Sequence, residues 1–270
     1  MDSEILADKI RKKAIEMVYR AKASHLGGAL SMADLLAVLY SDILRINPYE
    51  PNYVNRDRFV LSKGHACCSL YATLALRGFF SIDELSTYGE NGSRLMNHVS
   101  HKVPGVEFST GSLGHGLPFG VGKAIAAKRL GKDWRTFVLL SDGEMDEGSN
   151  WEALLHGAHY ELDNLIIIID YNKIQSLGAV NEVLALEPFS NKISSFNWQV
   201  KEINGHNHNE IRSALELVPL KRGRPSCIIA HTIKGKGVDF MENSLAWHYK
   251  TPNLIQFESA LNQINNYREK

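Results

Sequence analysis

The sequence predicts an α/β fold in which a mostly parallel central sheet is flanked by helices. Strand-like and helix-like segments alternate from about residue 58 onward, an order typical of parallel α/β proteins. Residues 165–169 form a continuous aliphatic run, as in a strand that is buried on both faces of a sheet. Asp142 and Asn172 lie just beyond the C-terminal ends of two of the expected strands. In α/β proteins, ligands bind at these strand ends.

The first part of the chain is expected to be helical. Apolar residues recur at helical spacing over residues 5–18. Ser31 and Asp34 have the spacing of a capping box, and they precede a second apolar segment that runs to Leu44. We therefore expect two helices before the first strand.

The middle of the chain alternates between strands and helices. A short apolar run predicts a strand over residues 59–61, and the pattern after it predicts a helix over about 65–78. A glycine-rich stretch then leads into a helix over 121–130. A strand over 136–140 and a helix over 151–162 follow.

The last third continues the alternation. After the aliphatic strand, we expect a helix over residues 209–218, a strand over 227–230 and a terminal helix over 253–267. Residues 175–197 show no clear periodicity and are expected to be mostly loop, a length that usually signals function in a compact domain. We find no internal repeat, low-complexity segment or linker, and so expect a single domain over residues 1–270.

The charge balance argues against nucleic acid or a membrane as a partner. The chain has 30 Lys+Arg and 30 Asp+Glu, so its formal net charge is zero. Proteins that bind nucleic acid or an acidic membrane surface through basic patches carry an excess of positive charge. With 44% hydrophobic and 22% charged residues, the composition is that of an ordinary globular protein.

The cysteines and the N-terminus predict a cytoplasmic protein. Cys67 and Cys68 are adjacent and Cys227 is the third, a poor framework for disulfides that also lacks the Cys-x-x-Cys spacing of metal sites. The longest aliphatic run is far shorter than the roughly 20 residues of a membrane span. Asp2 and Glu4 do not fit the basic start of a signal peptide.

Asp142 and Asn172 together predict a metal site. One helical crossover joins the strands that they follow, so both side chains are expected at the same edge of the sheet. A carboxylate, an amide oxygen and a nearby backbone carbonyl suit Mg²⁺ or Ca²⁺, with phosphate oxygens and water completing the shell. Taken singly, each residue is more typical of a helix cap or a turn. Paired at this spacing, with Gly143 allowing close approach, they favour a metal-bound diphosphate.

Five segments resemble those of the transketolase family and occur in the family's order. The segment "SDGEMDEGSNWEALLHGAHYELDNLIIIIDYNKIQ" is similar to the thiamine diphosphate motif, which begins with Gly-Asp-Gly and ends with Asn. The other four are "ASHLGGALSMADLLAVLY", "RFVLSKGHACCSLYATLALRGF", "STGSLGHGLPFGVGKAIA" and "AHTIKGKGVDFMENSLAWH". The resemblance covers nearly the whole chain and implies the thiamine diphosphate-binding fold, in its diphosphate-binding (PP-type) N-terminal domain.

The resemblance implies a cofactor site. Asp142, Asn172 and the backbone carbonyl of Ile174 would hold Mg²⁺, with Ca²⁺ as an alternative ion. Gly143 and His65 would contact the diphosphate of thiamine diphosphate. Ser141 replaces the first glycine of the family's motif, a change that a residue with negative φ tolerates.

The resemblance also implies a substrate site. Gly111 and Leu113 would lie against the aminopyrimidine ring of the cofactor. His25, His98 and His248 would be catalytic and face the oxygens of the substrate, and His248 would also reach the diphosphate. Histidine suits proton exchange with hydroxyl and carbonyl oxygens because its ordinary pKa lies near neutral pH.

Two departures from the family pattern leave questions open. The family's Gly-His-Pro segment is Asn97, His98 and Val99 here, so His101 competes with His98 as the residue that faces the substrate. His115 stands where glutamine is common, a change that is expected to alter packing near the cofactor.

The resemblance implies an enzyme made of two kinds of chain. It would transfer a two-carbon ketol unit from a ketose or its phosphate to an aldose or its phosphate. The activating glutamate and the phosphate-binding arginines would come from a pyrimidine-binding domain, which, like the family's C-terminal domain, has no counterpart in residues 1–270. We therefore expect a partner that carries the pyrimidine-binding half, in a heterotetramer with two copies of each chain.

Other functions remain open at this point. The alpha-type subunit of a thiamine-dependent 2-oxo acid dehydrogenase has a similar metal motif. Gly114, Gly116 and Gly120 could belong to a dinucleotide-binding turn, although the segment before them is a poor buried strand. A protein that keeps the fold without catalysis is a further alternative.

Four more histidines are assigned little or no function. His156 and His159 lie one helical turn apart but lack a third ligand at zinc spacing. His206 and His208 are interpreted as solvent-facing loop residues.

Overall fold

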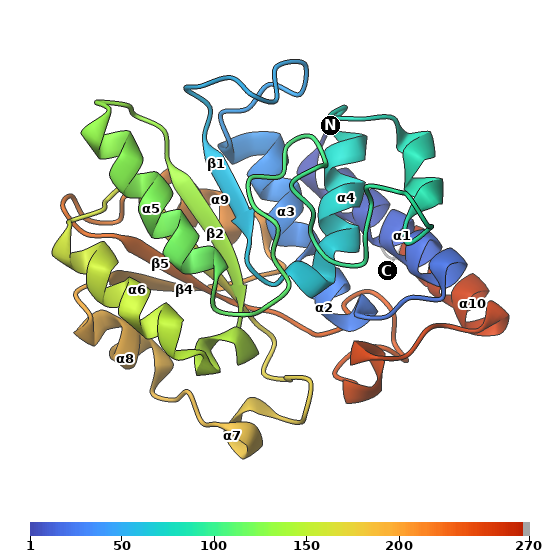
Figure 1. Ribbon diagram of the computed structural model, residues 1–270. Coiled ribbons are helices and arrows are strands. Elements are labelled where there is room, and N and C mark those ends of the chain that lie inside the picture. The colour runs from blue at the N-terminus through green and yellow to red at the C-terminus, as the bar shows by residue number, and fades with distance from the viewer. Residues whose placement is uncertain (267–270) are drawn as a thin grey trace.

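The computed structural model describes residues 1–266, and its centre is a five-stranded parallel sheet (Figure 1). The strands are β1 (Arg58–Leu61), β2 (Thr136–Ser141), β3 (Leu165–Tyr171), β4 (Gln199–Asn204) and β5 (Ser226–His231). Their order across the sheet is β1-β2-β3-β5-β4, and every neighbouring pair is parallel. The α/β class with a parallel sheet is confirmed.

Helices precede the sheet and connect its strands. The α-helices are α1 (Ser3–Ala21), α2 (Leu26–Ser31), α3 (Ala33–Val38), α4 (Cys67–Leu76), α5 (Gly116–Arg129), α6 (Gly148–His159), α7 (Val180–Val183), α8 (Phe189–Ser195), α9 (His208–Glu216) and α10 (Leu254–Asn265). Shorter turns of 3-10 or π type are η1 (Leu39–Ile43), η2 (Gly64–Ala66), η3 (Ile82–Thr87), η4 (Gly143–Asp146) and η5 (Leu245–His248).

Alternating side chains on the strands separate two apolar layers. Along β3, Ile166 and Ile168 pack into the core shared with α1, α3 and α4, whereas Leu165, Ile167 and Ile169 pack into the core shared with α5, α6 and α8. All five residues are fully buried. Helices on both faces thus shield the sheet, and its free ends are left for ligands.

The main difference from the predicted elements lies at the edge of the sheet. β4 was not predicted, because Lys201 and Glu202 interrupt its apolar pattern and most of its residues are partly exposed. The segment expected to be mostly loop contains the short helices α7 and α8. The predicted end of the last helix, Tyr267, lies outside the described residues.

The predicted capping box at Ser31 and Asp34 is wrong. Ser31 is the last residue of α2, and its hydroxyl donates to the carboxylate of Asp170 (2.6 Å) and to the carbonyl of Gly28 (3.0 Å). Asp34 lies inside α3 and binds Arg11. Both residues serve tertiary contacts that capping patterns do not foresee.

No helix within residues 1–266 is both long and apolar enough to cross a membrane.

Candidate active site

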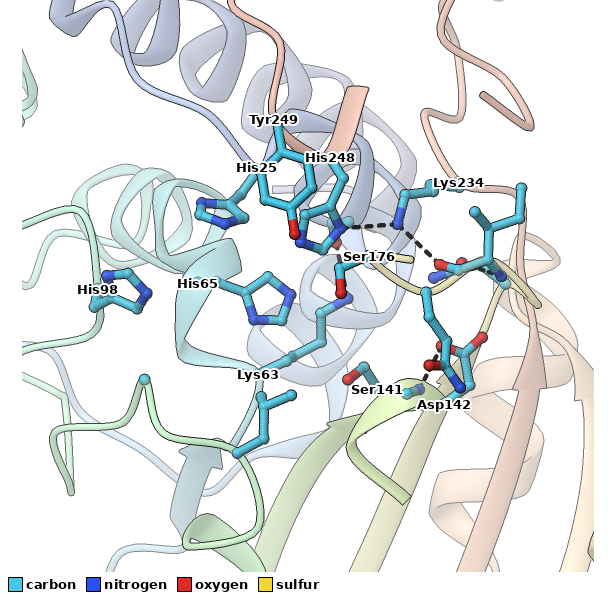
Figure 2. Close-up of a pocket in the computed structure, with 17 residues that line it drawn as sticks. His25, Lys63, His65, His98, Ser141, Asp142, Ser176, Lys234, His248 and Tyr249 are labelled. Atoms are coloured by element: carbon cyan, nitrogen blue, oxygen red, sulfur yellow. Dashed lines mark hydrogen bonds between the residues drawn. The ribbon is translucent and has the colours of Figure 1, made fainter. Parts of the chain in front are cut away.

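A cavity of about 230 Å³ lies beside the carboxyl ends of the strands, and all ten residues assigned to the site from the sequence line it. They come from the segment before α2, the turns after β1, β2 and β3, the glycine-rich loop before α5, and η5. Figure 2 shows the histidines on one side of the cavity and Asp142 on the other. The topology therefore gathers segments that are far apart in the chain.

The predicted metal ligands form one corner of the cavity. The Asp142 carboxylate accepts hydrogen bonds from the backbone N–H groups of Gly143 (2.7 Å) and Lys173 (2.6 Å). The side-chain oxygen of Asn172 accepts from the N–H of Ile174 (3.1 Å). Lys173, between them, has a φ of 68°, a left-handed conformation that turns the chain sharply at this point. Asn172 and Ile174 thus lie in one tight turn after β3, and the Asp142 carboxylate, from the turn after β2, is hydrogen-bonded to that turn.

The electrostatics of this corner favour a cation. Burial raises the pKa of Asp142 to about 6, and the nearby carboxylate of Asp170 adds to the increase. A buried carboxylate with a raised pKa gains from any positive charge that binds beside it. The oxygen donors are also those that Mg²⁺ and Ca²⁺ prefer. The residues present therefore fit a divalent cation with a diphosphate.

Gly143 lies in the crowded turn after β2. A Cβ at this position would come within 3.0 Å of the side chain of Gln175, which itself donates to Asp146 (3.0 Å). The adjacent departure, Ser141, is the last residue of β2 and is not among the residues with positive φ. Its hydroxyl accepts from the backbone N–H of Glu144 (3.2 Å), so serine is accommodated without strain.

A buried ion pair lies beneath the metal corner and was missed from the sequence. The Lys63 ammonium donates to Asp170 (2.5 Å) and to the carbonyl of Gly28 (2.9 Å). Asp170 also accepts from Thr232. Burial alone would raise the pKa of Asp170, but the Lys63 charge and these hydrogen bonds hold it below its usual value. This carboxylate therefore stays ionised and contributes to the field at Asp142.

Lys234 is a second lysine whose role was missed from the sequence. Its ammonium donates to the carbonyl of Ile174 (2.9 Å), a predicted metal ligand, and lies 3.3 Å from Nδ1 of His248. The side chain is buried, and desolvation together with Lys63 lowers its pKa to about 8. Both lysines lie within segments that were quoted for the family resemblance, and Lys63 stands two residues before the assigned His65.

Four histidines gather at the other side of the cavity (Figure 2). The ring centre of His25 lies 5.3 Å from that of His65, 5.9 Å from that of His98 and 5.1 Å from that of His248. His25 has a φ of 69°, and its backbone N–H donates to the carbonyl of His248 (2.8 Å). This left-handed turn before α2 directs the ring toward the others.

The pKa values of these histidines differ from the sequence expectation. Burial and the charge of His98 lower the pKa of His25 to about 4, while burial and Lys234 lower the pKa of His248 to about 3. Burial also keeps the pKa of His65 well below its ordinary value. These rings are neutral at pH 7, so each has one nitrogen that can accept a hydrogen bond from a hydroxyl group.

The structure distinguishes His98 from His101. His98 lines the cavity and packs against Gly111, where a Cβ would come within 3.0 Å of the imidazole. His101 lies outside the cavity lining, and its Nδ1 contacts the hydroxyl of Ser109 (2.7 Å). His115 is also exposed, with its Nδ1 3.1 Å from the carbonyl of Leu113.

The glycines considered for a dinucleotide turn serve packing instead. An added Cβ would overlap the Ser149 hydroxyl at Gly114, the Ser62 hydroxyl at Gly116 and the Val138 side chain at Gly120. The residues before these glycines form no strand in the described chain. Gly114 lies against the start of α6, whereas Gly116 and Gly120 lie where α5 approaches the residue after β1 and strand β2.

The interpretation of His206 and His208 as solvent-facing is wrong. Both bind the buried carboxylate of Asp34, with His206 Nδ1 at 2.7 Å and His208 Nε2 at 3.0 Å. In the described part of the chain, no group of three His, Cys, Asp or Glu side chains that could hold a metal ion includes His156 or His159.

The fold and its cavity define a parallel α/β protein whose ligand site lies at the carboxyl edge of its sheet. The family described as "Transketolase, thiamine diphosphate binding domain" matches residues 2–254. This chain belongs to the transketolase family. The match favours that family over the 2-oxo acid dehydrogenase alternative.

Two relatives of similar length are named as single subunits of transketolases. One from Phocaeicola vulgatus, a subunit of an apulose-4-phosphate transketolase, is 44% identical over 99% of this chain and 95% of the relative. One from Clostridium sp., a subunit of a 6-deoxy-6-sulfo-D-fructose transketolase, is 41% identical over 92% of this chain and 90% of the relative. The chain is accordingly part of a transferase built from subunits.

Solved transketolases share the fold but are longer. Transketolase from Leishmania mexicana superposes with a TM-score of 0.93 at 30% identity, over 98% of this chain and 41% of that one. The Campylobacter jejuni enzyme gives 0.92 at 34% identity, over 98% and 43%. The chain thus spans about two-fifths of the length of these enzymes.

Proposed function

We propose that this chain is the cofactor-binding half of a two-chain transketolase that moves a two-carbon ketol unit from a ketose to an aldose. The observation that carries the proposal is the convergence of all ten assigned residues on one cavity. The subunit names of its relatives and their similar lengths support a two-chain enzyme.

Asp142, Asn172 and the carbonyl of Ile174 would hold Mg²⁺, with Ca²⁺ as a substitute. Gly143 and His65 would contact the diphosphate, and Gly111 and Leu113 would lie against the aminopyrimidine of thiamine diphosphate. These assignments rest on the family motifs and on the shared cavity. When bound, the cofactor supplies the carbanion that attacks a ketose carbonyl and stores the electrons of the broken carbon–carbon bond.

The histidines would manage the protons of the sugar. His25, His98 and His248 would face its hydroxyl and carbonyl oxygens. The lowered pKa values keep the rings of His25 and His248 neutral at pH 7, so each can accept a hydrogen bond from a hydroxyl group of the sugar. Proton uptake needs a pKa nearer neutrality, and the negative charge of a bound diphosphate would raise the pKa of both rings in that direction.

The partner would be a chain that carries the pyrimidine-binding half of the site, in a 2+2 heterotetramer in the cytoplasm. Residues 1–270 would then be a single diphosphate-binding domain. Leu177 follows the cavity-lining Ser176 and is 78% exposed, and Leu184 on the same segment is also exposed. Exposed apolar side chains beside a cavity suit contact with another chain.

The substrate would be a ketose that carries an anionic group. The two relatives are named for a sugar phosphate and a sulfonated sugar. The test mixes this chain with the proposed pyrimidine-binding chain, thiamine diphosphate and Mg²⁺. Ketoses with a phosphate, a sulfonate or no anionic group are offered as donors, and ketose consumption is measured with an aldose acceptor. We expect turnover of anionic ketoses alone. Equal turnover of neutral ketoses would contradict this substrate class.

A further inference from the structure

We infer that His206 is a positioning residue, which holds the loop that carries Lys234 in place beside the predicted metal ligands. The hydrogen bonds around Asp34 support the structural part of this inference. Its consequence for cofactor binding rests on the proposed function. Neither the family motifs nor the cavity lining includes His206.

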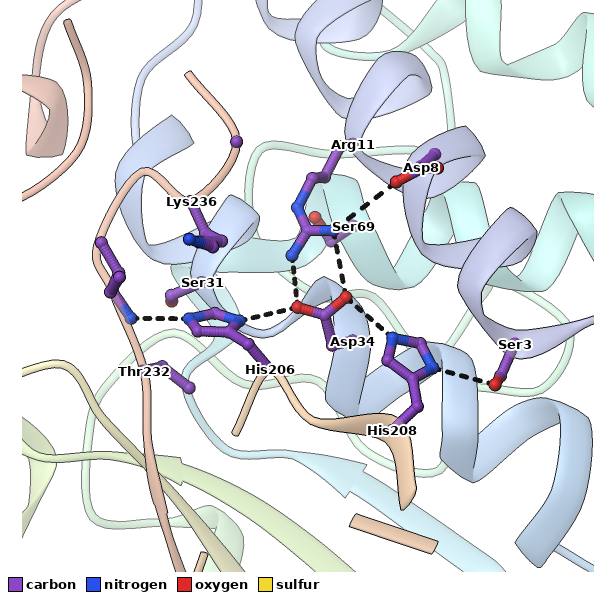
Figure 3. Close-up of polar contacts among 12 residues, drawn as sticks. Ser3, Asp8, Arg11, Ser31, Asp34, Ser69, His206, His208, Thr232 and Lys236 are labelled. Carbon is purple, nitrogen blue, oxygen red and sulfur yellow. Dashed lines mark hydrogen bonds and ion pairs between the residues drawn. The ribbon is translucent and has the colours of Figure 1, made fainter. Parts of the chain in front are cut away.

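Asp34 is the centre of a buried polar cluster (Figure 3). Arg11 from α1 donates to both of its oxygens, at 3.1 and 2.5 Å. His206, from the turn after β4, and His208, the first residue of α9, complete its contacts. Burial alone would raise the pKa of Asp34, but the Arg11 charge and the bonds from both histidines hold it well below its usual value. The carboxylate therefore accepts hydrogen bonds at any pH near neutrality.

The hydrogen bonds fix the state of His206. Since the Asp34 carboxylate can only accept, Nδ1 of His206 carries the proton and donates to it. The other ring nitrogen, Nε2, accepts from the backbone N–H of Ile233 at 2.8 Å. The imidazole is thus a neutral bridge with a defined tautomer. One end is anchored in the core by Asp34, and the other end holds the chain after β5.

Ile233 precedes Lys234 directly, so the backbone position of Ile233 determines the position of the Lys234 Cα atom. The ammonium of Lys234 reaches the carbonyl of Ile174 and Nδ1 of His248, one atom on each side of the cavity. A shift of the loop by a fraction of an ångström would misplace both contacts. The residues flanking this point are held differently: Thr232 donates to Tyr171 (3.2 Å) and Gly235 donates to Gly27 (2.9 Å). Between them, the carbonyl of Lys234 accepts from the N–H of Asn243 (2.9 Å), and His206 holds the N–H of Ile233 by a side-chain contact to the core.

His208 offers a matched control within the same cluster. It binds the other oxygen of Asp34, and its Nδ1 contacts the hydroxyl of Ser3 in α1 (2.9 Å). Each histidine therefore gives Asp34 one hydrogen bond. His206 alone of the two contacts the Lys234 loop in the described structure.

The test compares His206→Ala with His208→Ala. Amide hydrogen exchange of residues 231–236 is followed by mass spectrometry in the full chain, and thiamine diphosphate binding with Mg²⁺ is measured by calorimetry in the complex with the partner. For His206→Ala we expect exchange at Ile233 to quicken and cofactor affinity to fall, each by about tenfold, as for one lost hydrogen bond. For His208→Ala, both should stay within about twofold of wild type, although both variants lose thermal stability.

A third variant separates positioning from folding. In His206→Gln the amide can donate to Asp34 and accept from Ile233, so exchange and affinity should return toward wild type. Equal effects of His206→Ala and His208→Ala on loop exchange would overturn the inference, as would the absence of any effect. Failure of the wild-type complex to bind the cofactor would instead refute the proposed function, while loop exchange would still decide the role of His206.

Discussion

The surroundings of Asp142 disfavour the ionised form of its carboxyl group. Its carboxylate is 2% exposed and faces the ionised Asp170, so its pKa rises from 3.8 to about 6. A folded-state pKa above the unfolded one means that the folded chain binds the proton more tightly. The free energy of unfolding therefore falls as pH rises from about 4 to about 6, and the loss persists at neutral pH.

Replacing this charge should stabilise the chain while destroying its function. The shift from 3.8 to about 6 corresponds to roughly 3 kcal/mol. In buffer without metal or cofactor, we expect Asp142→Asn to raise the free energy of unfolding at pH 7.5 by up to about 3 kcal/mol, and to change it little at pH 4. Urea unfolding at both pH values measures this.

The same variant should lose Mg²⁺-dependent binding of thiamine diphosphate in the complex with the partner. The binding is measured by calorimetry with and without Mg²⁺. Normal cofactor affinity in Asp142→Asn would contradict the metal assignment, and a less stable variant at pH 7.5 would contradict the electrostatic argument.

The histidines should divide into two functional groups. His65 is assigned to the diphosphate, so His65→Ala should weaken cofactor binding. His25 is assigned to the substrate, so His25→Ala should lower kcat by a factor of roughly 100, the usual size of a lost acid–base group. His101, outside the cavity, provides the control in His101→Ala. Cofactor titrations and steady-state kinetics separate the effects, and loss of cofactor affinity alone in both cavity variants would refute the division.

At the residue level, the family motifs identified more of the site residues than hydrophobic periodicity or residue type could. The ten assigned residues converge on one cavity because each lies in a segment with a recognisable family motif. Lys63 and Lys234 were missed because lysine is ordinarily exposed. They are buried here because Asp170 and the carbonyl of Ile174, distant in sequence, are brought beside them. The lowered pKa values of His25 and His248 also depend on burial and on residues that are distant in sequence, so the sequence did not predict them.

At the scale of elements, the position of α5 depends on glycine. The helix passes so close to β2 that a Cβ on Gly120 would overlap Val138. Gly122 is in the same helix but faces solvent, with nothing within 4 Å of its added Cβ. Packing against β2 therefore requires glycine at position 120, whereas position 122 has room for a larger side chain.

Alanine at these two positions should change stability in opposite directions. Gly120→Ala forces α5 from the sheet and should cost about 1–3 kcal/mol. Gly122→Ala should stabilise by about 0.5–1 kcal/mol, because alanine loses less backbone entropy in a helix. Urea unfolding of both variants measures the difference. If Gly120→Ala and Gly122→Ala changed the free energy of unfolding by the same amount, the packing of α5 against β2 would not be what requires glycine at position 120.

The strands buried on both faces were predictable, but the edge strand was not. Residues 165–169 are apolar throughout because both faces of β3 are covered. β4 pairs only with β5 and keeps polar side chains such as Lys201 partly exposed, so its sequence lacks a buried pattern. The capping-box pattern failed because Ser31 and Asp34 each bind residues that are distant in sequence.

At the scale of the whole molecule, the site is gathered at one edge of the sheet, and the segment that follows the cavity-lining Ser176 carries exposed apolar side chains. The proposed partner would supply the pyrimidine-binding surface and cover Leu177 and Leu184. Cofactor chemistry would then depend on two chains meeting, and neither would transfer ketol units by itself.

The most direct test measures ketol transfer by this chain before and after the pyrimidine-binding chain is added. Xylulose 5-phosphate serves as a first donor with an aldose phosphate as acceptor, in thiamine diphosphate and Mg²⁺, and light scattering gives the mass of the mixture. We predict no transfer by this chain alone, and turnover with the partner in a particle of two copies of each chain. Robust turnover by this chain alone would contradict the two-chain account.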